Sequence, residues 1–335
     1  MRLENIVALT QGSLLNDPFI TSFDGIAFDV KKVKRGNLFI AIDSADIDDA
    51  VRNGAYGILF DKPAQIGDTE IAWIKVASVD DAMLRLLRFH LLEKEPDVYS
   101  CDPITLKLAQ QIMTTADFQV VSGGIAEIFN QLWECDKGTT LLFSPSETDS
   151  NLFVSAKEIP KTAVDSIAII EQTLFETSFI YNNVFYERQL LSPFFIPYLE
   201  RLLHFFKMLK IEFRLRPFTP IAHFEAVFTN SRFQVKEFGA TDRVIIFEPY
   251  FELIGQQIDF LERQANWAKI IYIIPSHKKQ FLDDTENIFT YRCERDIIQT
   301  LKSTDFHFAL IAEQDKSLLD KPLFKEKSEQ LTLDF

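Results

Sequence analysis

The sequence predicts an α/β protein with more than one domain. Short apolar runs rich in β-branched and aromatic residues alternate with segments in which apolar residues have helical spacing. Strand–helix alternation of this kind is typical of parallel sheets that are covered by helices on both faces. The length of 335 residues, at roughly 100–200 residues per domain, indicates two or three domains.

The first predicted domain covers residues 1–96. Three short β-rich runs predict strands, at residues 37–42, 57–60 and 71–76. A short helix over 46–53 is expected to end before Gly54, because glycine is common just past the end of a helix. A longer helix begins after Ser78, whose hydroxyl can cap the free N–H groups of the first turn.

The second predicted domain covers residues 97–215 and again alternates strands with helices. Four strands are expected, at residues 97–100, 118–121, 140–143 and 167–170. Asp102 and Pro103 are typical first residues of a helix, and this helix is expected to reach about residue 113. Two further helices are expected, at residues 126–133 and 193–209.

The third predicted domain covers residues 216–322, and residues 323–335 form a charged tail. Three strands are expected, at residues 244–247, 269–274 and 308–312. Two helices are expected between them, at residues 250–267 and 295–303. This order again indicates a mainly parallel sheet.

The chain is acidic, with 35 basic and 49 acidic residues and a formal net charge of −14. A surface of this sign repels nucleic acid and anionic membranes, so we expect neither as a direct ligand. The densest basic cluster, residues 31–35, is short. The three cysteines lie far apart and no apolar run approaches the ~18 residues of a membrane span, so we expect a cytoplasmic protein.

Glycine is scarce, with 11 residues where an average usage of about 7% would give roughly 23. Phosphate-binding loops use glycine to bring backbone N–H groups close to the ligand, so such loops must be few. Gly123 and Gly124 leave two interpretations open: a phosphate site at a helix N-terminus, or a tight turn, which we favour. The histidines lack metal-ligand spacing, so we predict no metal.

Three stretches of the first domain resemble the N-terminal block of the Mur ligases, the ATP-dependent family that adds amino acids to UDP-linked muropeptides. They read GIAFDVKKVKRGNLFIAI (25–42), GAYGIL (54–59) and IKVASVDDA (74–82). The resemblance, greatest to the D-alanyl-D-alanine-adding type, implies a three-domain arrangement with a reduced central domain and a Rossmann-like C-terminal domain. It also implies a UDP-sugar or muropeptide ligand. Asp29 matches the family's Asp and Lys31 stands at its Arg, so both are candidate ligand-binding residues.

The third domain also resembles this family. His223 stands where the family has the Arg of a G-R-x-E motif, and Glu248 and Tyr250 fall on its D-x-Y-x-x-N-P motif. Ligands of open α/β sheets gather where parallel strands end. Glu248, Tyr250 and His277 follow predicted strands and are therefore the candidate catalytic residues if the fold has changed its chemistry, although a solvated loop is our first interpretation around His277.

The phosphate-binding loop of the family is degenerate here. Residues 99–106 read YSCDPITL where the family has T-G-T-N-G-K-T-T, so the glycines and the lysine are missing. Asp102 places a carboxylate where a nucleotide phosphate would lie, and Pro103 removes an N–H donor. We therefore expect no ATP and no other cofactor at this loop, which comprises Ser100, Cys101, Asp102, Pro103, Ile104 and Thr105.

These features predict a Mur-ligase-like protein without ATP-dependent ligase activity, a scaffold or regulator connected to peptidoglycan precursor synthesis. A first alternative is an enzyme with changed chemistry that binds a UDP-sugar or muropeptide. A second is a binding module, because the C-terminal QLTLDF resembles peptides that dock on the bacterial DNA sliding clamp. We expect a protein partner, either cell-wall synthesis enzymes or that clamp. The candidate partner-binding residues are Gln330, Leu331, Leu333 and Phe335.

Overall fold

The structure is a computed structural model that describes residues 1–115, 117–161, 166–241, 243–282 and 286–321. These residues form two compact units. Unit 1 comprises Met1–Leu106 and Met113–Pro160, and unit 2 comprises Lys107–Ile112 and the described residues after Pro160. No helix in the described part of the chain is long and apolar enough to cross a membrane. The predicted partner-binding residues Gln330, Leu331, Leu333 and Phe335 lie outside the described residues.

Unit 1 begins with a five-stranded sheet in the order β1-β5-β4-β3-β2. The strands β2 to β5 are parallel, and β1 pairs with β5 in the antiparallel sense. The strands span Ser13–Leu14 (β1), Gly25–Ala27 (β2), Asn37–Ile40 (β3), Gly57–Phe60 (β4) and Ala72–Lys75 (β5). The helices span Leu3–Thr10 (α1), Ile47–Arg52 (α2) and Val79–Lys94 (α3). The three strands and two helices predicted for this segment are confirmed.

A second sheet of unit 1 has the order β7-β8-β6-β9, and every pair in it is parallel. Its strands span Asp97–Ser100 (β6), Phe118–Val121 (β7), Thr140–Phe143 (β8) and Lys157–Glu158 (β9). The helices of this segment span Pro103–Ile112 (α4) and Ile125–Trp133 (α5). All of these except the short β9 were predicted from the sequence.

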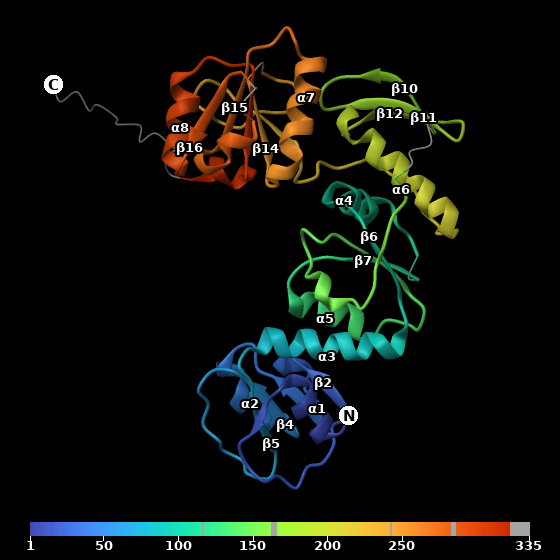
Figure 1. Cartoon of the computed structure of the whole chain (residues 1–335), viewed down its shortest axis with the longest axis vertical. Coiled ribbons are helices and arrows are strands. Elements are labelled where there is room, and N and C mark those ends of the chain that lie inside the picture. The colour runs from blue at the N-terminus through green and yellow to red at the C-terminus, as the bar shows by residue number, and fades with distance from the viewer. Residues whose placement is uncertain (116, 162–165, 242, 283–285, 322–335) are drawn as a thin grey trace, which may run out of the picture. The chain divides into compact units, whose positions relative to one another are not determined.

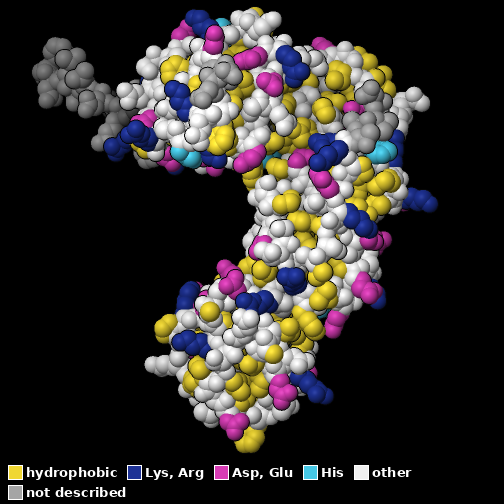
Figure 2. Space-filling model, in the orientation of Figure 1, with side chains coloured by type: hydrophobic (Ala, Val, Ile, Leu, Met, Phe, Trp, Pro, Cys, Tyr) yellow, Lys and Arg dark blue, Asp and Glu magenta, His cyan; other side chains and the backbone are white. Residues whose placement is uncertain are grey.

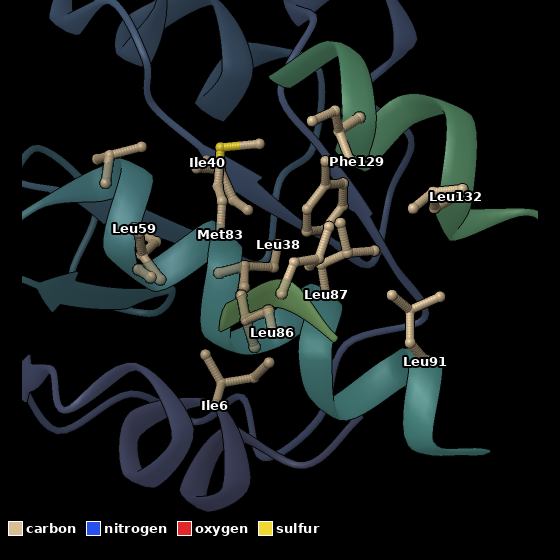
Figure 3. Packing of buried hydrophobic residues seen from close by; sticks show 14 of the residues in the cluster. Ile6, Leu38, Ile40, Leu59, Met83, Leu86, Leu87, Leu91, Phe129 and Leu132 are labelled. Carbon is tan, nitrogen blue, oxygen red and sulfur yellow. The ribbon is translucent and has the colours of Figure 1, made fainter. Parts of the chain in front are cut away.

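Helix α3 joins both sheets of unit 1 through one hydrophobic core. The helix begins at Val79, after Ser78 Oγ accepts a hydrogen bond from the N–H of Asp81 at 3.2 Å, as the sequence predicts. Its buried face packs between the first sheet and α5. Figure 3 shows the side chains that meet there: Ile6, Leu38, Ile40, Leu59, Met83, Leu86, Leu87, Leu91, Phe129 and Leu132.

Unit 2 contains a small antiparallel sheet that alternation of strands and helices does not predict. Its strands are Ile167–Gln172 (β10), Thr177–Tyr181 (β11) and Val184–Gln189 (β12), in that order across the sheet. Figure 1 shows helix α6 (Ile196–Leu209) running beside them. The buried Glu200 of α6 accepts hydrogen bonds at Oε1 from the N–H groups of Ser166 and Ile167, at 2.7 and 2.8 Å, which ties this helix to the start of β10.

The larger sheet of unit 2 has the order β13-β14-β17-β15-β16. Four of these strands are parallel, and only β13 pairs in the antiparallel sense, with β14. The strands span Glu225–Phe228 (β13), Val244–Glu248 (β14), Ile270–Pro275 (β15), Ile288–Tyr291 (β16) and Phe308–Ala312 (β17). Helices α7 (Ile254–Gln264) and α8 (Glu294–Ser303) lie on either side of the strands in Figure 1. This is the parallel, helix-covered sheet expected for the third segment.

Candidate functional site

A pocket of about 460 Å³ lies in unit 1, between the segment around β2 and β3 and helix α5. Both candidate ligand-binding residues, Asp29 and Lys31, line this pocket. Its other polar and aromatic lining residues include Lys32, Lys34, Asn37, Phe129, Asn130, Trp133 and Glu134. We call this cavity the lysine pocket.

Two short side chains shape the lysine-bearing loop. Asp29 Oδ1 accepts a hydrogen bond from the N–H of Lys31 at 3.0 Å and so caps a short 3₁₀ turn, Val30–Lys32. Asn37 Oδ1 accepts from the N–H of Lys34 at 2.8 Å. The backbone between β2 and β3 is therefore held by local hydrogen bonds, because the side-chain oxygens of Asp29 and Asn37 accept from backbone N–H groups that no neighbouring strand pairs with in this turn. The lysine side chains take no part in these bonds.

The lysine side chains give the pocket its charge. Lys31, Lys32 and Lys34 are exposed, and within the described part of the chain none of them forms a salt bridge. Three lysines face two carboxylates in the lining, Asp29 and Glu134, so the pocket carries a formal charge of 3 − 2 = +1. In a chain with a net charge of −14 such a site favours an anionic ligand locally. On the face that Figure 2 shows, basic side chains are otherwise scattered among acidic and hydrophobic ones.

The opposite wall of the lysine pocket is aromatic. Phe129 and Trp133, one turn apart on α5, stack with ring centroids 4.7 Å apart and planes 10° apart. Phe28 meets the Phe129 ring edge-on at 5.7 Å. Trp133 is half-buried, and because Phe129 and His90 stack on its two faces it offers a ligand the edge of its ring. Lysines facing aromatic rings are suited to a ligand that combines an anionic group with a flat ring.

The degenerate phosphate loop has a closed geometry. Asp102 Oδ1 accepts a hydrogen bond from the N–H of Thr105 at 2.8 Å, and Asp102 Oδ2 accepts from the Thr105 hydroxyl at 2.7 Å. The carboxylate thus occupies the start of α4, where an anion would seek N–H donors. The N–H of Cys101 is also engaged, by the carbonyl of Phe143 at 2.9 Å. The remaining residues of this loop are Ser100, which ends β6, and Pro103 and Ile104, which open α4.

The diglycine before α5 is covered by an acidic side chain. Gly124 N–H donates to Glu127 Oε2 at 3.2 Å. Gly123 has φ +105°, a backbone conformation that favours glycine, and the same Glu127 oxygen lies beside it. The carboxylate therefore takes the place that a phosphate would need. Of the two interpretations of this diglycine, the structure supports the tight turn.

The candidate Glu248 lies in the interior of unit 2, at the end of β14, with no exposed surface. Its Oε1 lies 2.9 Å from His223 Nδ1 and accepts from the N–H of Tyr250 at 2.9 Å. Its Oε2 accepts from the N–H of Phe224 at 3.1 Å and from Gln257 Nε2 at 2.5 Å. A buried carboxylate requires such donors, because an unpaired charge in the interior is costly.

The structure brings together two of the three candidate catalytic residues. Tyr250 follows Glu248 and donates its N–H to that carboxylate, and its ring lies 5.3 Å from the ring of His223. His277 is exposed, in a 3₁₀ turn after β15, and is not among the partners of Glu248. His223, matched to the family motif but not chosen as a site residue, is instead the side chain that pairs with Glu248.

No protein-family profile matches the sequence, and no curated protein is similar to it in sequence. Solved structures of MurF are nevertheless similar in fold. MurF from Acinetobacter baumannii (crystal structure I) superposes with a TM-score of 0.52 at 9% identity, over 97% of this chain and 99% of that chain. The MurF ligase of Thermotoga maritima in complex with ADP gives 0.49 at 12% identity, over 90% and 97%.

The similarity to the Acinetobacter baumannii structure covers both units. At 9% identity it establishes the fold and not the activity. The chain therefore has the multi-domain α/β fold of the Mur ligases, with parallel sheets and flanking helices, and the predicted fold class is confirmed.

Proposed function

We propose that this chain, which has the Mur ligase fold, binds a UDP-linked peptidoglycan precursor in the lysine pocket without ligating it. It acts in the cytoplasm as a scaffold or regulator of precursor synthesis, in company with the enzymes of that process. The observation that carries this proposal is the composition of the pocket: Lys31, Lys32 and Lys34 face the stacked rings of Phe129 and Trp133.

The chemistry of a UDP-sugar fits these walls. The diphosphate carries the negative charge that unpaired lysines attract, and the uracil ring can lie against the exposed edge of Trp133, whose two faces are covered by Phe129 and His90. A volume of about 460 Å³ lies in the range of about 300–1,000 Å³ that small-molecule pockets occupy. Asp29 supports the proposal indirectly, because its carboxylate holds the turn from which Lys31 projects.

The absence of ligase activity is proposed from the start of α4. A phosphoryl-transfer site needs N–H donors and a lysine around the nucleotide phosphates. Here the Asp102 carboxylate bonds the N–H and hydroxyl of Thr105, and Ile104 stands at the lysine position. The negative charge of Asp102 and its hydrogen bonds to Thr105 therefore both disfavour binding of a nucleoside triphosphate at this loop.

Isothermal titration calorimetry on the full chain tests the proposal. A UDP-N-acetylmuramoyl peptide should bind, UDP alone should bind more weakly, and ATP with Mg²⁺ should give no heat at millimolar concentration. Competition between UDP and the muropeptide would place both in one site. Micromolar ATP binding that is lost on changing Thr105 would overturn the proposed absence of ligase activity.

A further inference from the structure

Unit 2 carries a groove with an aromatic floor, far in the sequence from the lysine pocket. Its volume is about 670 Å³. The floor is a series of neighbouring rings: Trp267 and Phe308 have centroids 6.1 Å apart, Phe308 and Phe175 6.1 Å, Phe175 and Phe228 6.0 Å, and Phe228 and Phe238 4.8 Å. These five residues come from the β10–β11 turn, the strands β13 and β17, which lie on either side of β14, and the loops before β14 and β15.

Two of these rings are open to solvent. Trp267 is 69% exposed and Phe238 is 46% exposed. Burying apolar surface gains about 25 cal/mol of free energy per Å². A groove that leaves rings of this size exposed therefore favours binding of an apolar ligand. Among the residues that the structure describes, the charged side chains in the lining are Arg188 and Glu176, which pair at 3.5 Å. The groove therefore suits an uncharged ligand.

A smaller cavity, of about 60 Å³, shares the side chains of Phe175 and Phe238 with this groove. Its wall includes His223, which is only 1% exposed. The Nε2 atom of His223 is buried and has no hydrogen-bond partner among the described residues. Buried polar atoms are almost always bonded, so an unpartnered nitrogen beside a cavity indicates a missing partner.

The hydrogen-bonding role of that nitrogen follows from its neighbour. A carboxylate accepts, so at 2.9 Å from Glu248 Oε1 the Nδ1 atom of His223 is the donor. In the neutral imidazole the other nitrogen, Nε2, is then an acceptor. The group that completes the cavity must therefore donate a hydrogen, and in a space this small a hydroxyl is suitable.

We propose that the groove and the inner cavity together bind an uncharged aromatic compound that carries a hydroxyl group. The rings of the ligand lie on the floor formed by Trp267, Phe308, Phe175, Phe228 and Phe238. Its hydroxyl reaches past Phe238 and donates a hydrogen bond to His223 Nε2. This site is independent of the lysine pocket and lies in the other unit. It takes an uncharged ligand, whereas the lysine pocket takes an anionic one.

A pair of matched probes tests the proposal on the unmodified full chain. 2-Naphthol has two fused rings and a hydroxyl, and in 2-methoxynaphthalene a methyl group removes the donor. A net hydrogen bond is worth about 0.5–1.5 kcal/mol, so calorimetry should show 2-naphthol binding about threefold to tenfold more tightly. Equal affinities, or tighter binding of the methoxy compound, would overturn the hydroxyl contact.

Variants then locate the probe. Trp267→Ala and Phe238→Ala should each weaken 2-naphthol binding by about fivefold, since an aromatic pair contributes roughly 0.5–1.5 kcal/mol. Phe281→Ala is the matched control, because Phe281 is 63% exposed in the same unit and does not line the groove. Binding that survives both groove variants, or that the control weakens equally, refutes the site.

A third variant addresses the acceptor. His223→Phe keeps a ring in the cavity but removes Nε2, so the preference for 2-naphthol over 2-methoxynaphthalene should disappear. A preference that persists in the folded variant would contradict the role of His223. If this variant does not fold, the nitrogen-15 resonance of His223 Nε2 in the unmodified chain decides, since it shifts on accepting a hydrogen bond and stays fixed otherwise.

Discussion

His90 of α3 stacks on Trp133 of α5, with ring centroids 4.1 Å apart and planes 18° apart. The His90 Nε2 atom also lies 2.7 Å from the carbonyl oxygen of Trp133, and since a carbonyl only accepts, that nitrogen carries a hydrogen. The pair fixes the ring of Trp133, which lines the lysine pocket. The shape of the proposed ligand site therefore depends on a histidine outside its wall.

This pair predicts a pH dependence of the stability of unit 1. Burial lowers the pKa of His90 below its ordinary value of 6.5, so the folded state binds this proton less readily than the unfolded state. The resulting stability is fully present above the unfolded pKa and is lost as pH falls through the folded pKa. The free energy of unfolding can be measured with urea between pH 7.5 and 5, followed by tryptophan fluorescence. Over this range it should fall less for His90→Phe than for the unmodified chain. His277→Phe, at an exposed histidine, should leave the slope unchanged.

The charge of the lysine pocket predicts how its ligand responds to substitution and salt. Replacing Lys31, Lys32 and Lys34 together by Gln should weaken UDP binding by at least about 30-fold, since each lost charge contact removes roughly 0.7 kcal/mol or more. Raising the salt concentration should weaken UDP binding by the unmodified protein but hardly affect UDP binding by the triple variant. Lys62→Gln, at an exposed lysine outside the pocket, is the control. Unchanged calorimetric affinity in the triple variant would place UDP elsewhere.

The cap at the start of α4 predicts a stability loss that is separate from any nucleotide. Asp102→Ala removes the acceptor of both Thr105 bonds and should lower the free energy of unfolding by about 1 kcal/mol, within the range of about 0.5–2 kcal/mol for helix caps. Asp17→Ala, in an exposed loop, should change it by less than about 0.5 kcal/mol. Chemical denaturation measures both. A stabilised Asp102→Ala chain would mean that the carboxylate is strained by its surroundings.

The buried Glu248 predicts the largest loss. Glu248→Ala leaves His223 Nδ1, Gln257 Nε2 and two backbone N–H groups without their acceptor and should destabilise unit 2 by about 3–5 kcal/mol. The comparison is Glu294→Ala, which breaks a partly exposed ion pair with Lys321 and should cost about 1 kcal/mol or less. If the two variants had the same melting temperature, the hydrogen bonds of Glu248 would not stabilise the fold.

Periodicity and caps predicted most of the fold, because these signals are local. The small sheet of unit 2 was missed except for β10, although its hairpin had a readable signal. Asn182 and Asn183 lie between two β-rich runs, and their φ values of 47° and 61° are those of the tight turns that join antiparallel strands. Strand–helix alternation along the sequence does not predict such an antiparallel pair.

The site was predicted only as far as it is local. Asp29 and Lys31 were found because they lie within one short motif, and they do line the pocket. Trp133 comes from a helix about a hundred residues later, and only packing of α5 against α3 brings its ring to the lysines. His223 and Glu248 are separated by 25 residues and are joined through the sheet that holds β13 and β14. Spacing along the chain cannot show either meeting.

The position of α3 makes the two sheets of unit 1 a single cooperative block. A chain ended after Glu95 would leave the side of α3 that faces α5 uncovered, and a chain begun at Asp97 would leave Phe129 and Leu132 without their cover. Neither half keeps its core alone, so amide hydrogens of α1, α3 and α5 should exchange with solvent in one shared opening. A small ligand in the lysine pocket, held by residues from both halves, would slow that opening throughout the block.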